Sequence, residues 1–100
     1  MALTIKQDYE YKNDDWWDWS VWIEGTEQEL DSIESVEYTL HPTFPNPVRK
    51  ITDRASKFRL KTAGWGGFTV YAKALHKDGG DTWLEHELKL YYPDGRVTNA

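Results

Sequence analysis

The chain has 100 residues, a formal net charge of −5 and no cysteine. A chain of this length supports one hydrophobic core, so we expect a single domain over residues 1–100. The absence of cysteine excludes disulfides and thiolate metal sites. The acidic balance argues against DNA or RNA as the main partner, because binding to a phosphate backbone needs clustered lysine and arginine.

The N-terminus lacks the basic and apolar regions of a secretory signal. No apolar run approaches the roughly 20 residues that are needed to span a bilayer. We therefore expect an intracellular protein that is not inserted in a membrane.

The first half of the chain predicts strands separated by polar loops. Residues 1–15 are polar and end in a loop-forming Asn-Asp-Asp, and the next eight residues, WWDWSVWI, predict a strand. Alternate residues from Trp17 to Ile23 are all apolar and would share one face of that strand. Leu30, Ile33 and Val36 follow at a spacing of three, which favours a helical turn or a folded loop.

Between residues 35 and 60 the prolines divide the pattern. Residues 35–40 alternate and predict a strand, whereas three prolines within residues 42–47 exclude a central strand and indicate a structured loop. Short edge strands are expected at residues 48–51 and 58–60.

The second half predicts a hairpin. Glycines surround Trp65 in residues 64–67, which indicates a tight turn that needs positive φ or close backbone approach. Residues 68–74 alternate, residues 78–81 read DGGD and predict a hairpin turn, and residues 84–90 alternate again. A last turn is expected at residues 93–95. The whole pattern predicts an all-β sandwich of seven to eight short strands.

Two segments carry a more specific pattern. Residues 36–47 read VEYTLHPTFPNP, and residues 62–68 read TAGWGGF. Together they resemble the YEATS family, whose signature is V-x-Y-x-L-H-x-S/T-F/Y-x-x-P followed by G-W/Y-x-x-F. The resemblance extends over residues 15–92. The acidic, tryptophan-rich N-terminal part resembles the prokaryotic relatives more than the nuclear histone readers.

The chain also departs from the family pattern. Thr43 stands where the family more often has serine, and residues 53–58 replace a block that usually contains two prolines.

The resemblance implies an immunoglobulin-like β-sandwich of antiparallel strands whose loops at one end bind acetyl-lysine or longer acyl-lysines. Phe44 and Trp65 would flank a narrow channel, and His41 and Phe68 would line it. The Thr43 hydroxyl and the backbone N–H of Trp65 would form hydrogen bonds with the acyl amide.

The resemblance implies further contacts near this channel. Gly66 and Gly67 would let the backbone approach the ligand, and Glu87 would pair with a basic residue of the peptide. Trp16 lies in a loop that could reach the channel, so a peptide contact is considered for it as well. The remaining tryptophans are interpreted mainly as packing rings, except that the role of Trp17 stays open.

Simple physical chemistry supports these residue types for such a ligand. Burying an amide without partners costs about 1–3 kcal/mol, so the site must supply hydrogen bonds. Aromatic faces accept a flat group between them. A channel open at its far end would tolerate longer chains, so we expect crotonyl-lysine to bind more tightly than acetyl-lysine.

The expected partner is an acylated lysine in a peptide or protein, which would be a histone-like tail in a eukaryote. We expect a monomeric module of a larger protein, in the cytoplasm if the source is bacterial and in the nucleus if it is eukaryotic. No cofactor and no metal is expected, because the spacing of His76, His86, Asp78 and Asp81 matches no ligand pattern. No nucleophile motif supports an enzyme. Two alternatives stay open: an immunoglobulin-like adaptor that has lost the pocket, and a carbohydrate-binding module.

Overall fold

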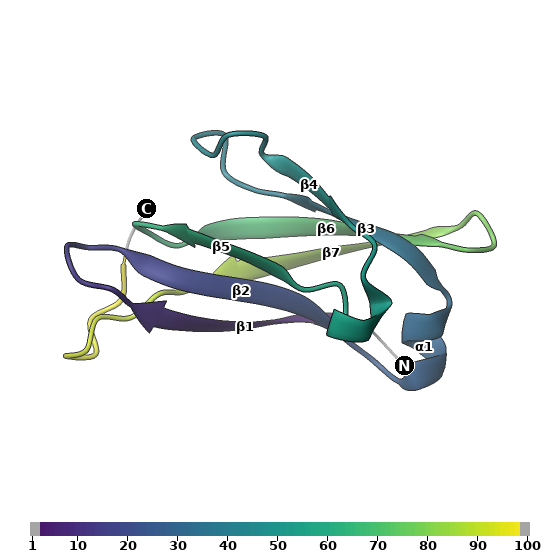
Figure 1. Ribbon diagram of the computed structural model, residues 1–100, viewed down its shortest axis with the longest axis horizontal. Coiled ribbons are helices and arrows are strands. Elements are labelled where there is room, and N and C mark those ends of the chain that lie inside the picture. The colour runs from purple at the N-terminus through teal and green to yellow at the C-terminus, as the bar shows by residue number, and fades with distance from the viewer. Residues whose placement is uncertain (1–2, 99–100) are drawn as a thin grey trace.

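The structure is a computed structural model that describes residues 3–98. Within this range the chain forms two antiparallel sheets, one of three strands in the order β1-β2-β5 and one of four strands in the order β4-β3-β6-β7 (Figure 1). The strands are β1 (Thr4–Tyr11), β2 (Trp17–Glu24), β3 (Ile33–Thr39), β4 (Val48–Ile51), β5 (Leu60–Gly64), β6 (Phe68–His76) and β7 (Asp81–Leu88), with short helices α1 (Glu27–Asp31) and η1 (Arg54–Ser56). The predicted all-β fold with seven antiparallel strands is confirmed.

The core lies between the inner faces of the two sheets. In β2 the side chains of Trp17, Trp19, Val21 and Ile23 are all buried, as the alternation in the sequence predicts. The four-stranded sheet contributes the other half of the core through Val36, Tyr38, Val70, Ala72, Ala74 and Leu88.

Strand β1 was not expected from the sequence. It pairs with β2 along its whole length, although Ile5 is its one fully buried side chain. Gln7 then joins β1 to the other sheet, because its side chain donates to the Lys89 carbonyl at 2.8 Å and contacts His86 Nε2 at 2.6 Å. A polar sequence can therefore form an edge strand when backbone pairing and a few long side chains hold it.

The predicted helical turn exists but ends earlier than the spacing of three suggests. Helix α1 begins after Thr26, whose side chain forms a capping box with Glu29, and it buries Leu30. Ile33 belongs to β3, where it pairs with His76 of β6. β-branched residues favour such a strand, and the ladder to β6 outweighs the helical spacing.

The predicted strand at residues 58–60 is wrong at its start. Phe58 follows η1 and has a φ of 58°, so it lies outside the sheet and β5 begins at Leu60. Its side chain is nevertheless fully buried, and its carbonyl accepts a hydrogen bond from Tyr38 Oη at 2.6 Å. A buried aromatic residue in a turn cannot be told from a strand residue by hydrophobicity alone.

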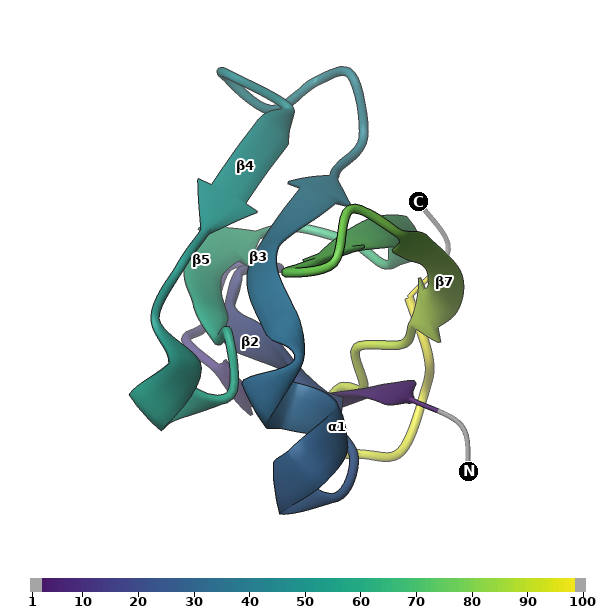
Figure 2. The same cartoon turned by 90° about the vertical axis from the view of Figure 1, so that its right-hand side faces the viewer.

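The connections β1–β2 and β5–β6 lie at one end of the sandwich, and α1 lies at the other (Figure 1). Seen from the α1 end, the β3–β4 hairpin rises above the rest of the molecule (Figure 2). Among the described residues, no helix is long and apolar enough to cross a membrane.

Candidate ligand-binding site

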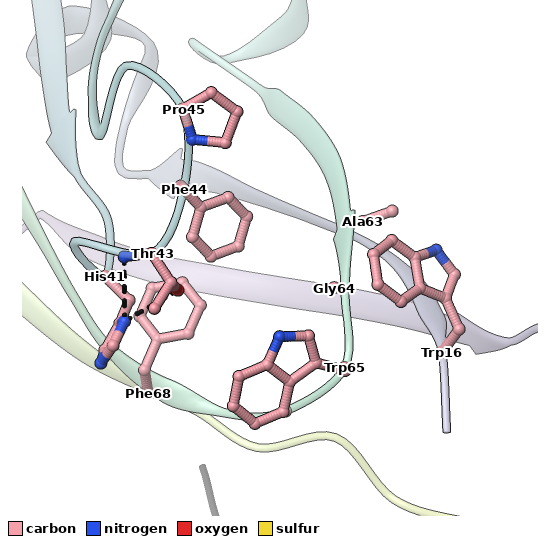
Figure 3. A pocket seen from close by; sticks show the side chains of 10 residues that line it. Trp16, His41, Thr43, Phe44, Pro45, Ala63, Gly64, Trp65 and Phe68 are labelled. Carbon is pink, nitrogen blue, oxygen red and sulfur yellow. Dashed lines mark hydrogen bonds between the residues drawn. The ribbon is translucent and has the colours of Figure 1, made fainter. Parts of the chain in front are cut away.

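A cavity of about 160 Å³ lies between the β3–β4 loop and the β5–β6 connection (Figure 3). Of the nine residues predicted to take part in binding, seven line it, namely Trp16, His41, Thr43, Phe44, Trp65, Gly66 and Phe68, and Pro45, Ala63 and Gly64 complete the wall. Two sequence segments that are twenty residues apart thus form one site.

Phe44 and Trp65 lie on different sides of this cavity (Figure 3). Phe44 is half-buried, and its ring centroid lies 5.3 Å from that of Phe68. Trp65 is 53% exposed and therefore is not part of the core. The arrangement leaves one ring anchored on the core and the other at the entrance, with space for a ligand between them.

Hydrogen bonds hold the loop that carries Phe44. The backbone N–H of Leu40 donates to the Pro47 carbonyl at 2.7 Å and so closes the loop. Arg49 of β4 donates from Nε to the Asn46 carbonyl at 2.6 Å and from Nη2 to the Pro45 carbonyl at 2.8 Å. The loop is therefore fixed before any ligand arrives, which lowers the entropy lost on binding.

His41 orients the hydroxyl of Thr43. The Thr43 backbone N–H donates to His41 Nδ1 at 3.2 Å, and Thr43 Oγ1 lies 2.9 Å from the same nitrogen. Because an N–H can only donate, Nδ1 is the unprotonated ring nitrogen, and the hydroxyl proton must also point to it. The lone pairs of Thr43 Oγ1 are then available to accept an N–H from a ligand.

The glycines beside Trp65 serve close approach, since none of the three has a positive φ. A Cβ on Gly67 would lie 2.2 Å from the Leu88 carbonyl oxygen, which only glycine avoids. The Gly67 N–H donates to Thr98 Oγ1 at 3.0 Å, so this predicted residue lies outside the cavity and packs against the C-terminal segment.

Trp19 supports the cavity from beneath, a position that the sequence did not reveal. It is 2% exposed, as expected for a packing ring. Its ring meets Phe44 and Phe68 edge-on at interplanar angles of 84° and 70°. Within residues 3–98 its indole N–H has no hydrogen-bond partner. Alternation places Trp19 on the inner face of β2, but only the packing shows which loop residues lie above it.

Glu87 is exposed on β7 opposite Thr69 and lies outside the cavity. It borders a second hollow of about 400 Å³ that also contacts Phe68. His76 contacts the hydroxyl groups of Ser32 and Thr82 at 3.1 and 2.8 Å, so its ring is held by side chains of the fold.

The cavity wall is electrically neutral. Among the described residues that line it, none is Lys, Arg, Asp or Glu, and His41 is the one that can titrate near neutral pH. Aromatic faces, a hydroxyl acceptor and backbone N–H groups suit a flat, uncharged polar group better than an ion.

A β-sandwich that carries a preformed aromatic cavity between loops at one end defines a class of small ligand-binding modules. A family model described as the prokaryotic YEATS domain matches residues 17–89, and the chain belongs to this family. YEATS domains are reader modules.

Curated relatives include the Saccharomyces cerevisiae "Protein AF-9 homolog", which is 40% identical over 87 residues covering 82% of this chain and 38% of that protein. "Transcription initiation factor TFIID subunit 14" of Schizosaccharomyces pombe is 35% identical over 79 residues, covering 74% of this chain and 31% of that protein. The chain thus spans between a third and two-fifths of the length of these two relatives.

Solved structures of the Yaf9 YEATS domain have the same fold. The Yaf9 domain recognising an H3K122suc peptide has a TM-score of 0.65 at 28% identity, covering 88% of this chain and 68% of that one. The Yaf9 domain bound to H3K27ac has a TM-score of 0.65 at 26% identity, covering 96% and 73%.

Proposed function

We propose that this domain binds an acylated lysine side chain of a peptide or protein in the cavity between Phe44 and Trp65. The observation that carries the proposal is the placement of these two rings, which come from separate loops and border one neutral cavity. The titles of the Yaf9 structures, which name succinylated and acetylated peptides, support the same ligand class.

The chemistry of the wall fits an acyl amide. Acylation removes the charge of lysine, which would otherwise need acceptors that this cavity does not hold. The Thr43 hydroxyl, already oriented by His41, would accept the amide N–H. The Trp65 backbone N–H would donate to the acyl carbonyl, and Gly66 beside it has no side chain to block the approach.

The domain would act by binding and not by catalysis. The cavity is open and its rings are not collapsed onto each other, which favours a reader over an adaptor that has lost its pocket. We place the domain in the cytoplasm, in line with its prokaryotic family, as one module of a larger protein whose partner carries the acylated lysine.

Isothermal titration with an acetyl-lysine peptide, its crotonyl counterpart and the unmodified peptide tests the proposal. The wild type should bind both acylated peptides and not the unmodified one. Trp65→Ala should weaken binding about tenfold or more, because one aromatic wall and its buried area are lost. Trp65 is half exposed, so the variant should still fold.

Trp83→Ala is the matched control. Trp83 is 67% exposed on β7 and does not line the cavity. Its loss should leave the affinity unchanged. Equal binding by wild type and Trp65→Ala, or binding of the unmodified peptide as tightly as the acylated ones, would refute the proposal.

A further inference from the structure

The unpartnered indole N–H of Trp19 marks a specific place in the wall of the cavity. Trp19 is 2% exposed, and its Nε1 has no hydrogen-bond partner in the described part of the chain. Buried indole N–H groups normally have a partner, so a donor left without one at the edge of a ligand cavity indicates an acceptor that comes with the ligand.

Gly64 leaves the way to this donor open. Gly64 lines the cavity, and an atom at the position of its missing Cβ would lie 3.5 Å from Trp19 Nε1 and 3.4 Å from Phe44 Cζ. Both are ordinary contact distances, so there is room for one atom between the tip of the Phe44 ring and the indole. Any side chain larger than hydrogen at position 64 would fill that space.

We infer that this space takes a neutral oxygen at the far part of the acyl chain, and that the preferred ligand is a hydroxylated acyl-lysine such as 3-hydroxybutyryl-lysine. The inference rests on the proposed function of the same cavity. An oxygen there needs to move toward the indole by about half an ångström to reach a normal N–H···O distance of ~2.9 Å. The hydroxyl would satisfy the Trp19 N–H, which a purely apolar chain leaves unpaired.

The acceptor is neutral because the wall offers no charge to balance an anion. Among the described residues, neither lysine nor arginine lines the cavity, and Asp18 of β2 lies directly opposite Ala63 at its border. A single neutral donor does not offset the burial of a carboxylate. Acyl chains that end in a carboxylate should therefore bind less well than the hydroxylated chain.

Titration of two peptides that differ by one oxygen tests the inference. Wild type should bind a 3-hydroxybutyryl-lysine peptide about threefold to tenfold more tightly than the butyryl-lysine peptide. Gly64→Ala places a methyl group in the space without backbone strain, and Trp19→Phe removes the donor but keeps an aromatic ring. In both variants the ratio of the two affinities should fall to one or below.

Trp22→Phe is the matched control for loss of an indole N–H. Trp22 projects from the opposite face of β2, where its Nε1 donates to Glu24 at 2.8 Å, so the ratio should stay at the wild-type value. In NMR spectra the indole proton signal that disappears in Trp19→Phe should move downfield when the 3-hydroxybutyryl peptide binds, and not when the butyryl peptide binds.

The outcomes separate this inference from the function on which it rests. If neither peptide binds to the wild type, the proposed function fails. If both bind equally, or if the preference survives in Gly64→Ala, only the role of the Trp19 donor is overturned. Tighter binding of a succinyl-lysine peptide than of the 3-hydroxybutyryl peptide would overturn the neutral acceptor.

Discussion

Tyr38 links the two layers of the sandwich through one buried hydroxyl. Its side chain is fully buried on β3, and Oη donates to the Phe58 carbonyl at 2.6 Å, just before β5 begins. Replacing Tyr38 with Phe leaves that carbonyl without its partner, so the free energy of unfolding should fall by about 1–3 kcal/mol in urea denaturation. Tyr71→Phe, on an exposed side chain of β6, should change it by less than about 0.5 kcal/mol.

The same hydroxyl makes stability depend on alkaline pH. Burial raises the pKa of Tyr38 well above its usual range, whereas a tyrosine in the unfolded chain titrates near 10. Above pH 10 the unfolded state loses a proton that the folded state keeps, so this contribution is complete below pH 10 and falls with rising pH. The stability gap between wild type and Tyr38→Phe should therefore narrow above pH 10; a constant gap from pH 8 to 11 would contradict it.

At this scale the sequence reveals the rings of the site but not the residues beneath them. Phe44 and Trp65 could be predicted as exposed rings because prolines or glycines flank them. The position of Trp19 under the cavity, and of Gly64 and Ala63 in its wall, depends on how two sheets stack. That stacking is a long-range property that a local pattern does not contain.

Among the elements, the β3–β4 loop is the part of the site with the clearest support. Arg49 donates to the carbonyls of Pro45 and Asn46. Arg49→Ala should lower the affinity for an acyl-lysine peptide about threefold to tenfold, because the loop that carries Phe44 must then be ordered on binding. Arg49→Lys should not restore it, since an ammonium lacks the two-pronged geometry of the guanidinium.

Lys50→Ala provides the control for this element. Lys50 is the neighbouring residue on β4 and is exposed. Its loss should leave the affinity unchanged. If Arg49→Ala binds as tightly as the wild type, the loop is held by its prolines alone.

Strands with a clear inner and outer face could be predicted, whereas those held by backbone pairing could not. β2, β6 and β7 alternate strongly, and their inner faces are as the sequence predicts. β1 carries little apolar surface and was missed, because pairing with β2 determines it. Phe58 misled the prediction of β5, because its burial arises in a turn.

At the scale of the whole molecule, the cavity lies between two loops and has no charged residue among its described lining. A longer neutral chain can therefore gain apolar burial along the aromatic walls. A crotonyl-lysine peptide should bind up to about tenfold more tightly than the acetyl-lysine peptide, since two added carbons contribute about 1.5 kcal/mol of burial. Titration of both peptides measures this, and equal or reversed affinities would show that the cavity closes behind the acetyl group.

The two walls of the cavity belong to segments that join different layers. Phe44 comes from the loop between two strands of the four-stranded sheet, and Trp65 from the connection that leaves β5 of the three-stranded sheet. A side chain held between them acts as a non-covalent cross-link of the sandwich. Binding adds RT ln(1 + [L]/Kd) to the free energy of every opening that separates these walls. Backbone amides of β2 and β6, in opposite layers, should then gain equal protection from hydrogen exchange when the site is saturated.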